Sequence, residues 1–402
     1  MKILVLNSGS SSLRFKLFEA KGWQCLFKGH VDGIGLSTCR LRGDIEKKIK
    51  VQDHRQALEI ALLSFQEAKI LKSTSDIKAI GHRVVHGGEK YQLPLKITPK
   101  ILRELTKLND LAPLHNPPNL AGISACFKLT PLIPNIAVFD TGFHTTLPET
   151  AFLYGLPYKY YQKHQIRKYG FHGTSHSYVS KEAIKWLKHA KKSWQRIITC
   201  HIGNGISVTA IKNGKSLETS MGFTPLEGVM MGTRTGDFDP SIILHLINHL
   251  KMDAKEIDHL LNHESGLKGL SGISSDMRPL WGILQNPKHQ SHNKVKRAYD
   301  VYVYRLAKMI ASYTVPLGGI DALIFTAGIG ENAWYLRRDV CAQLLHFGLK
   351  LDVSKNRRTY EGIEGHIHAK NSAVSVLVIP TDEELQIAKE VKKVRSGADG
   401  RD

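Results

Sequence analysis

Residues 196–240 read RIITCHIGNGISVTAIKNGKSLETSMGFTPLEGVMMGTRTGDFDP. The β-branched run Ile197–Thr199 predicts a strand that leads into the polar glycine turn His201–Gly205, and Ile206–Ile211 predicts a second strand. The dipeptide Asn213-Gly214 then suits a tight hairpin turn. A glycine turn between two strands lets backbone N–H groups approach an anion without side chains between them. This stretch therefore predicts a phosphate-binding site.

The start of the chain repeats this plan. Lys2–Leu6 predicts a buried strand, a polar glycine turn begins at Asn7, and Leu13–Phe18 predicts a second strand. Two copies of one unit about half a chain apart suggest a duplicated domain, with a ligand in the cleft between the copies. Two unrelated hairpins are the alternative, since hairpins are common.

Charged side chains accompany several of the predicted strands. Ala79–Gly88 predicts a strand that carries Arg83, and a buried arginine needs a carboxylate or a phosphate as its partner. Arg83 therefore pairs either with a structural acid or with an anionic ligand. Asp140 follows the strand Ile136–Phe139, where α/β proteins keep catalytic groups, although a turn or helix cap would also explain it. Arg234, between two glycines, is expected beside the phosphate site.

Histidines and further glycine turns extend the candidate site. His172 and His176 are four residues apart, but no glutamate follows His172, and Gly173 suits a helix start better than a metal-binding helix. We therefore expect His172 to contact an anion and His176 to have a packing or capping role. The segment Gly266–Pro279 is predicted to be a glycine-serine loop. A second glycine turn, Gly328–Asn332, lies between a strand and a helix, which suits a nucleotide.

Acidic residues precede the last helix. Asp382, Glu383 and Glu384 follow the strand Ser375–Ile379. Carboxylates in this position either bind Mg²⁺ or cap the helix. The chain has no Gly-x-x-x-x-Gly-Lys-Ser/Thr loop and no protein-kinase signature, so any phosphoryl transfer belongs to another class.

Composition limits the class of protein. The 402 residues allow two domains with ordinary cores, and the 42% hydrophobic and 23% charged residues are typical of a soluble globular protein. No apolar run approaches the roughly 20 residues that span a bilayer, and the chain turns polar at Asn7, too early for a secretory signal. The five cysteines are an odd number without Cys-x-x-Cys spacing. They predict reduced thiols and a cytoplasmic location.

The net charge of +20 could reflect binding to nucleic acid or to an anionic membrane. However, the lysines are spread along the whole chain, and no helix-turn-helix, zinc-finger or single-strand-binding signature is present. We therefore expect a basic surface without a nucleic-acid or membrane partner. A nucleic-acid-binding protein is kept as a distant alternative.

Taken in order, these motifs resemble those of the acetate kinase family. The matching segments run essentially from end to end and are Asn7–Phe18, Arg83–Gly88, Phe139–His144, Phe171–His176, His201–Gly205, Gly232–Pro240 and Gly328–Asn332. The resemblance implies two duplicated ribonuclease-H-like α/β domains of the actin-like ATPase fold, with a nucleotide cleft between them. The N-terminal domain, on the acyl-substrate side, would comprise residues 1–148 plus 384–402. The C-terminal domain, for nucleotide binding and dimerisation, would comprise residues 149–383.

The resemblance also implies roles for single residues. The catalytic residues would be Asp140, His172 and Arg234, and the metal ligands would be Asn7 and Glu383. Arg83 would bind the acetate carboxylate, and the methyl pocket would be formed by Val85, Leu114, Phe171 and Pro225. The nucleotide-binding residues would be Arg14, His201, Ile202, Gly203, Asn204, Gly205, Asp276, Met277, Arg278, Gly328, Ile329, Gly330, Glu331 and Asn332.

The implied reaction is the reversible in-line transfer of the γ-phosphoryl group of ATP to acetate, giving acetyl phosphate and ADP. It would use Mg²⁺ or Mn²⁺ and a homodimeric enzyme, and Asp382 would add a carboxylate near the metal. Because acetate is already ionised at pH 7, the transfer needs charge neutralisation and positioning more than acid–base chemistry. Asp140 is therefore expected to orient Arg83, Arg234 or a metal-bound water. A propionate or other short-chain acyl kinase of the same fold is the alternative.

Overall fold

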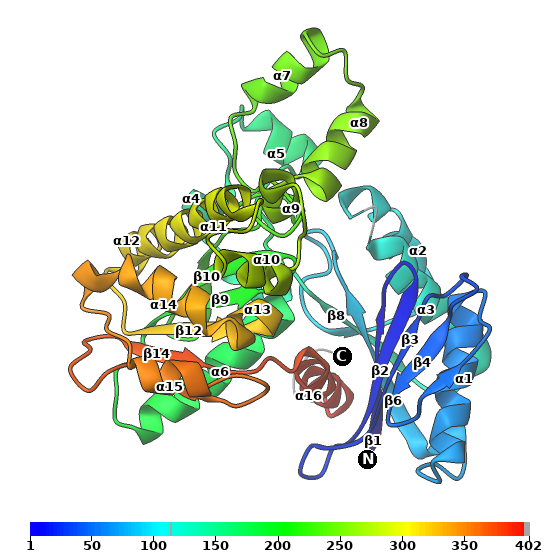
Figure 1. Cartoon of the computed structure of the whole chain (residues 1–402). Coiled ribbons are helices and arrows are strands. Elements are labelled where there is room, and N and C mark those ends of the chain that lie inside the picture. The colour runs from blue at the N-terminus through cyan, green and yellow to red at the C-terminus, as the bar shows by residue number, and fades with distance from the viewer. Residues whose placement is uncertain (113–114, 398–402) are drawn as a thin grey trace. The chain divides into compact units, whose positions relative to one another are not determined.

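The computed structural model describes residues 1–112 and 115–397 of the chain (Figure 1). The chain divides into two compact units. Unit 1 comprises Met1–Gly142 and Asp382–Asp402, and unit 2 comprises Phe143–Thr381. The domain boundaries expected from the sequence, after residues 148 and 383, lie a few residues further along the chain and stay predictions. Among the described residues, no helix is both long enough and apolar enough to cross a bilayer.

Unit 1 is built on a mixed sheet with the strand order β5-β4-β3-β2-β1-β6-β8-β7. Its strands are β1 (Lys2–Ser8), β2 (Ser12–Glu19), β3 (Gln24–Asp32), β4 (Arg40–Gly43), β5 (Lys47–Lys48), β6 (Ile77–Val84), β7 (Leu95–Lys96) and β8 (Asn135–Phe139). The strands β1, β2 and β3 pair antiparallel, whereas β6 and β8 continue the sheet in parallel with β1. Side chains alternate along β1, so Leu4 and Leu6 enter one apolar cluster while Ile3 and Val5 enter another.

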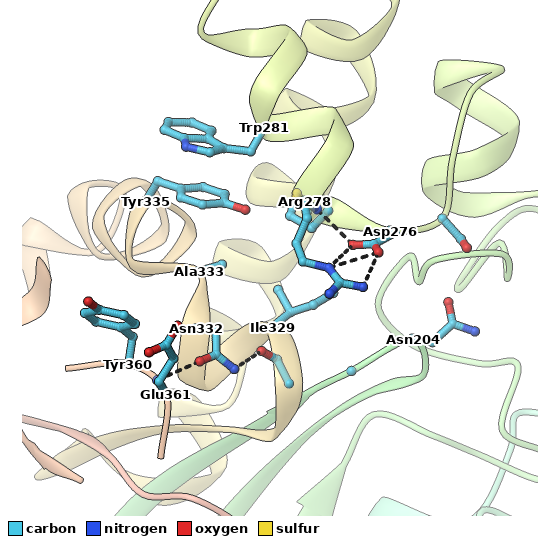
Figure 2. Close-up of a pocket in the computed structure, with 14 residues that line it drawn as sticks. Asn204, Asp276, Arg278, Trp281, Ile329, Asn332, Ala333, Tyr335, Tyr360 and Glu361 are labelled. Carbon is cyan, nitrogen blue, oxygen red and sulfur yellow. Dashed lines mark hydrogen bonds and ion pairs between the residues drawn. The ribbon is translucent and has the colours of Figure 1, made fainter. Parts of the chain in front are cut away.

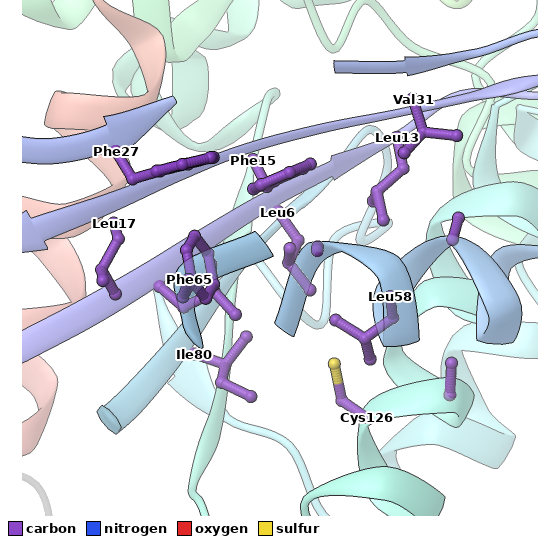
Figure 3. Close-up of a cluster of buried hydrophobic side chains, with 14 of the residues drawn as sticks. Leu6, Leu13, Phe15, Leu17, Phe27, Val31, Leu58, Phe65, Ile80 and Cys126 are labelled. Carbon is purple, nitrogen blue, oxygen red and sulfur yellow. The ribbon is translucent and has the colours of Figure 1, made fainter. Parts of the chain in front are cut away.

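Helices cover both faces of this sheet. They are α1 (His54–Glu67), α2 (Pro99–Thr106), α3 (Asn116–Leu129) and α16 (Glu383–Arg395). Beneath α1, the ring centroid of Phe65 lies 5.6 Å from that of Phe15 and 5.3 Å from that of Phe27 (Figure 3). On the opposite face, α16 approaches so closely that a Cβ on Gly81 would lie 2.7 Å from Val391. The last helix of the chain is therefore part of the N-terminal unit.

Unit 2 repeats the core of this topology. Its sheet has the order β11-β10-β9-β12-β14-β13. The strands are β9 (Arg196–Ile202), β10 (Ile206–Lys212), β11 (Lys215–Thr219), β12 (Ala322–Thr326), β13 (Gly365–His366) and β14 (Ser375–Val378). Again three strands pair antiparallel, and two further strands run parallel to the first of them. The order β3-β2-β1-β6-β8 therefore corresponds to β11-β10-β9-β12-β14, and the predicted duplicated α/β fold is confirmed.

The helices of unit 2 form a larger set. They are α4 (Glu149–Phe152), α5 (Lys159–His164), α6 (Gly173–His189), α7 (Ser241–Asn248), α8 (Ala254–His259), α9 (Gly266–Ser271), α10 (Met277–Leu284), α11 (His292–Ser312), α12 (Thr314–Leu317), α13 (Ala327–Asn332), α14 (Trp334–Ala342) and α15 (Val353–Arg358). A π-helical turn, Leu260–Glu264, follows α8. One apolar cluster joins Val179 and Leu187 of α6 to Ile197 and Ile324 of the sheet. The predicted hairpin turn is also found, with φ of 51° at Asn213 and 78° at Gly214.

Two local predictions were wrong. The segment Gly266–Pro279 is not a loop, because it contains α9 and the start of α10. Asp276 accepts a hydrogen bond from the N–H of Arg278 and so provides the N-cap of α10. The glycine turn Gly328–Asn332, predicted between a strand and a helix, lies within the short helix α13, which ends at Asn332. Glycine has low helix propensity, so contacts from elsewhere in the fold must hold this turn in the helical form.

Candidate functional site

The C-terminal ends of β6 and β8 place an ion pair in unit 1. The Nη2 atom of Arg83 donates to Oδ2 of Asp140 over 2.8 Å, and Asp140 is only 1% exposed. Of the two partners considered for Arg83, the structural acid is therefore present. The buried Nε of Arg83 makes no hydrogen bond within the described residues, and Oε2 of Glu383 lies 3.9 Å from it. One strong donor of this guanidinium is thus left for a further acceptor.

Glu383, the first residue of α16, lies in the same group of charges. Burial raises the pKa of its carboxyl group, and Asp140 and Glu384 raise it further, while Arg83 and Arg14 lower it. Arg14 of β2 pairs in register with Asn7 of β1. The predicted metal ligand Asn7 therefore lies near the end of the strand pair that carries Arg14. Among the described residues, no cluster of three or more His, Cys, Asp or Glu side chains could hold a metal ion.

Asp382 has partners of its own. Its Oδ1 accepts from the N–H of Leu385 over 3.0 Å as the N-cap of α16, and from Nζ of Lys16 over 2.9 Å. Lys16 also lies 3.1 Å from Glu384. Asp382 therefore caps α16, which is one of the two roles expected for it, and the charge of Lys16 offsets its negative charge.

Asn119 of α3 joins two predicted parts of the site in unit 1. Its Nδ2 donates to the carbonyl of Ser8 over 2.6 Å, and its Oδ1 accepts from the N–H of Val85 over 3.0 Å. One side chain thus connects the residue after Asn7 with the buried Val85. Sequence reasoning did not identify Asn119, since only its position after two prolines marks it. Leu114, the other predicted pocket residue before α3, lies outside the described residues.

In unit 2, His172 stands at the N-cap of α6 with a left-handed φ of 55°. Its ring stacks on that of His201 with centroids 4.1 Å apart. The hydroxyl of Ser207 lies 2.8 Å from Nδ1 of His172 and 2.7 Å from Nε2 of His176. His176 is buried, so the packing role expected for it is present. Ser207, like Ser175 beside Nδ1 of His201, escaped sequence reasoning.

Arg234 and His172 meet at the glycine turn between β9 and β10. A Cβ on Gly205 would lie 3.4 Å from Nη1 of Arg234 and 3.5 Å from Cε1 of His172, so both side chains lie within van der Waals reach of this turn. Nη1 of Arg234 donates to the carbonyl of Pro225 over 3.2 Å. Arg234 has no carboxylate partner among the described residues, and burial lowers its pKa. A partly buried cation without a counter-ion is suited to bind an anion.

Next to this turn, unit 2 contains a pocket with a volume of about 910 Å³ (Figure 2). The predicted nucleotide residues that line it are Gly203, Asn204, Asp276, Met277, Arg278, Gly328, Ile329 and Asn332. The other predicted nucleotide residues of unit 2 do not line it, and they are His201, Ile202, Gly205, Gly330 and Glu331. Of these, Ile202 is fully buried, and the carboxylate of Glu331 accepts from the N–H of Thr381.

Six lining residues were missed from the sequence, and they are Ser275, Trp281, Ala333, Tyr335, Tyr360 and Glu361. The rings of Trp281 and Tyr335 stack with centroids 3.7 Å apart and planes 2° from parallel. Figure 2 shows these two rings and Tyr360 at one end of the pocket, away from Asn204. The only sequence signal was that aromatic residues follow both Asp276 and Asn332 within a few positions. An aromatic end opposite glycine backbone is an arrangement suited to a base and its phosphates.

Comparisons with known proteins give one consistent match. The profile of the Acetokinase family matches residues 2–389. The chain is 47% identical to the acetate kinase of Thermotoga petrophila over 402 residues, which cover 98% of each protein. Two crystal structures superpose with a TM-score of 0.89 over 98% of this chain and 99% of theirs. They are the acetate kinase of Porphyromonas gingivalis, 41% identical, and a propionate kinase of Francisella tularensis subsp. tularensis, 39% identical.

Proposed function

This chain belongs to the acetokinase family, and on that basis we propose that it transfers the γ-phosphoryl group of ATP to acetate. The products are acetyl phosphate and ADP, and the reaction is reversible. The relatives named acetate kinase support this proposal over 98% of the chain. A propionate kinase with the same TM-score supports only the fold, so a short-chain acyl kinase is the second candidate.

The observation that carries the proposal is the uncompensated guanidinium of Arg234 beside His172 at Gly205. Phosphoryl transfer to a carboxylate brings two anions together, so the site must supply positive charge at the transferring group. Arg234 and His172 would hold the equatorial oxygens of that group. The hydroxyl of Ser207 would fix the orientation of the His172 ring through Nδ1. Such preorganised donors act at the charge that develops in the transition state.

Arg83 would bind the acetate carboxylate. Its Nη2 is engaged by Asp140, and its Nε is a buried donor without a hydrogen bond in the described part of the chain. Asp140 would orient the guanidinium and would not remove a proton, because acetate has none to lose at pH 7. Val85 would contact the methyl group, and Leu114, Phe171 and Pro225 stay predicted residues of its pocket. The predicted nucleotide cleft between the domains stays a prediction.

The nucleotide would occupy the pocket of unit 2, with its phosphates at Gly203 and Gly328 and its base at the aromatic end. Asp276 and Arg278, which pair with each other at 2.6 Å, would flank the ribose. Arg14, which is predicted to contact the nucleotide, belongs to unit 1. Its side chain is exposed, and its charge lowers the pKa of Glu383. These roles explain why glycine and aromatic residues line the same pocket.

Mg²⁺ or Mn²⁺ would bind at Asn7 and Glu383. An amide oxygen and a carboxylate are hard oxygen donors, and one or two of them suffice for Mg²⁺ when phosphate oxygens and waters complete the shell. Burial raises the pKa of Glu383, and the nearby Asp140 and Glu384 raise it further; these neighbouring carboxyl groups also favour a cation there. The metal would neutralise phosphate charge. Asp382 is already paired with Lys16, so we do not propose it as a metal ligand.

We further propose a cytoplasmic homodimer. The five cysteines are free thiols, and four of them are buried, which suits a reducing compartment. Exposed apolar side chains gather on and beside α7, where Ile242 is 45%, Leu244 60% and Leu250 62% exposed. An apolar group of this kind is typical of a protein–protein contact. A second copy of the chain is the partner we propose.

Release of ADP tests the proposal directly. The protein is mixed with ATP and Mg²⁺, and ADP formation is followed with acetate, with propionate, with butyrate and with no carboxylate. We expect ADP formation that depends on acetate and falls as the acyl chain lengthens. ADP formation at the same rate without any carboxylate would instead indicate an ATPase. Equal kcat/KM for acetate and propionate would favour the second candidate.

A further inference from the structure

Arg337 of α14 is the largest fully buried side chain described, with an exposed fraction of 0%. All five N–H donors of its guanidinium are used. Nε donates to Oδ1 of Asn356 over 2.8 Å, and Nη1 donates to the carbonyls of Gly330 and Glu331 over 2.8 and 2.6 Å. Nη2 donates to the carbonyls of Asn356 and Thr359 over 2.8 and 2.7 Å. No carboxylate is among these acceptors, and burial lowers the pKa of Arg337 to about 10.

Burying a cation among neutral oxygens costs free energy, so the arrangement of the groups that hold Arg337 needs an explanation. The carbonyls of Gly330 and Glu331 belong to the last turn of α13. Asn356 lies in the last turn of α15, and Thr359 is its C-cap. One guanidinium therefore caps the negative ends of two helices at once. It fixes the distance between the end of α13 and the end of α15.

Both helix ends lead into the pocket lining. Ile329 and Asn332 of α13 line the pocket, and so do Tyr360 and Glu361, which follow directly after Thr359 (Figure 2). Tyr360 is 42% exposed and Glu361 is also exposed, so apolar packing does little to hold them. Glu361 moreover has a left-handed φ of 52°, which a non-glycine residue adopts only when its surroundings impose it.

Asn332 makes a second connection between the same two parts. Its Oδ1 accepts from the N–H of Glu361 over 2.8 Å, and its Nδ2 donates to the carbonyl of Gly328 over 2.8 Å. Both ends of this amide are thus used within the protein. Asn356 adds a further bond, from Nδ2 to the carbonyl of Trp334. Residues 360–361 are therefore positioned by polar contacts, with Arg337 at their centre.

We propose that Arg337 is a positioning residue for the nucleotide, which holds residues 360–361 against α13 and so sets the width of the base end of the pocket. Arg337 touches neither substrate. The inference rests on the proposed function, because it assumes that a nucleoside triphosphate occupies this pocket. It predicts that a change at Arg337 alters the affinity for the nucleotide and the choice of base, but leaves the acetate side in unit 1 unaffected.

The test compares Arg337→Lys with Arg337→Met in the full chain. Lysine keeps the charge and some donors, whereas methionine keeps only the volume. We expect the KM for ATP to rise about ten- to a hundredfold in Arg337→Met, since small displacements in a binding site have effects of this size. Arg337→Lys should restore part of the loss. In both variants the KM for acetate should be unchanged, and the preference for ATP over GTP and CTP should narrow.

Asn356→Ala provides a second variant, because Asn356 accepts from Nε of Arg337 but does not line the pocket. It should shift the KM for ATP in the same direction, and this result decides the matter if Arg337→Met does not fold. An unchanged KM for ATP and unchanged base preference in the folded variants would overturn the inference. A rise in the KM for acetate of the same size would overturn it too. If the wild-type protein shows no ATP binding by calorimetry, the proposed function itself fails, which is a distinguishable result.

Discussion

Arg83 and Asp140 form a partly buried ion pair in unit 1, with 2.8 Å between Nη2 and Oδ2. Their strands β6 and β8 run parallel, and the two residues lie at neighbouring C-terminal ends. Asp140 therefore has a defined partner, and the Nε edge of Arg83 is left for another acceptor. This relationship supports the proposal that Asp140 orients Arg83 for binding of the substrate carboxylate.

Asp140→Asn tests whether the charge of Asp140 holds Arg83 in its orientation, because asparagine keeps the size of the side chain but removes its charge. We expect kcat/KM for acetate to fall about a hundredfold as the guanidinium loses its fixed geometry. The KM for ATP should change little. Asp321→Asn is the matched control, since Asp321 is also buried and also pairs with an arginine, Arg196. An equal fall in acetate kcat/KM in both variants would mean that only stability had been changed.

Arg234→Ala should lower kcat by about a hundredfold or more, because one electrostatic contact to the transition state is lost. The fold should be unaffected, since Arg234 has no carboxylate partner in the described part of the chain and its removal leaves no buried charge unpaired. Steady-state kinetics and thermal unfolding check both statements. Arg297→Ala, at an exposed arginine of α11, is the control. Near-normal kcat in a folded Arg234→Ala protein would remove Arg234 from the mechanism.

Val85→Ala should widen the methyl pocket. The wild-type protein should prefer acetate over propionate, and one methylene in such a pocket is worth about 1–3 kcal/mol. Because Val85 is buried directly after the last residue of β6, its truncation should raise kcat/KM for propionate relative to acetate. Val84→Ala truncates the preceding residue, which packs in an apolar core cluster, and should not change this ratio. Unaltered acyl preference in Val85→Ala would place the methyl group elsewhere.

Stability should depend on pH through His82. This residue is 2% exposed, its Nε2 lies 2.7 Å from Oδ1 of Asn135, and burial lowers its pKa from 6.5 to about 4. The unfolded chain binds a proton below about pH 6.5, whereas the folded protein does not. The contribution of His82 to stability is therefore complete above pH 6.5 and falls by about 3 kcal/mol as the pH drops towards 4.

Urea unfolding at several pH values tests this statement. In His82→Gln the difference in unfolding free energy between pH 7 and pH 4.5 should be smaller than in the wild type. His189→Gln, at an exposed histidine, should keep the wild-type dependence. Parallel curves for the wild type and His82→Gln would show that His82 does not couple folding to protons.

The duplicated sheets could be predicted because their signals are local. Asn7 and His201 each stand near the end of a short apolar strand, followed by a glycine turn and a second strand, and the ends of β1 and β9 bear out both patterns. The polar residues at strand ends were found for the same reason. Arg83 and Asp140 are adjacent because parallel strands end at one edge.

The missed features depend on contacts between distant parts of the chain. The glycine-rich α13 is a helix although glycine disfavours one, and Arg337 supplies hydrogen bonds to its last carbonyls. Asn119 and Ser8, which share a hydrogen bond, are 111 residues apart in sequence. The Trp281–Tyr335 stack likewise joins two helices. No local pattern encodes such pairs. The site roles assigned from the family resemblance stay predictions until variants are measured.

The central claim is the transfer of phosphate from ATP to a carboxylate, and trapping the product with hydroxylamine tests it most directly. The protein is incubated with ATP, Mg²⁺, acetate and hydroxylamine, and the hydroxamate is compared with the ADP released. We predict acetyl hydroxamate in proportion to ADP with the wild type, and about a hundredfold less with Arg234→Ala. Absence of any hydroxamate from acetate, propionate or butyrate, with a folded protein that binds ATP, would contradict the claim.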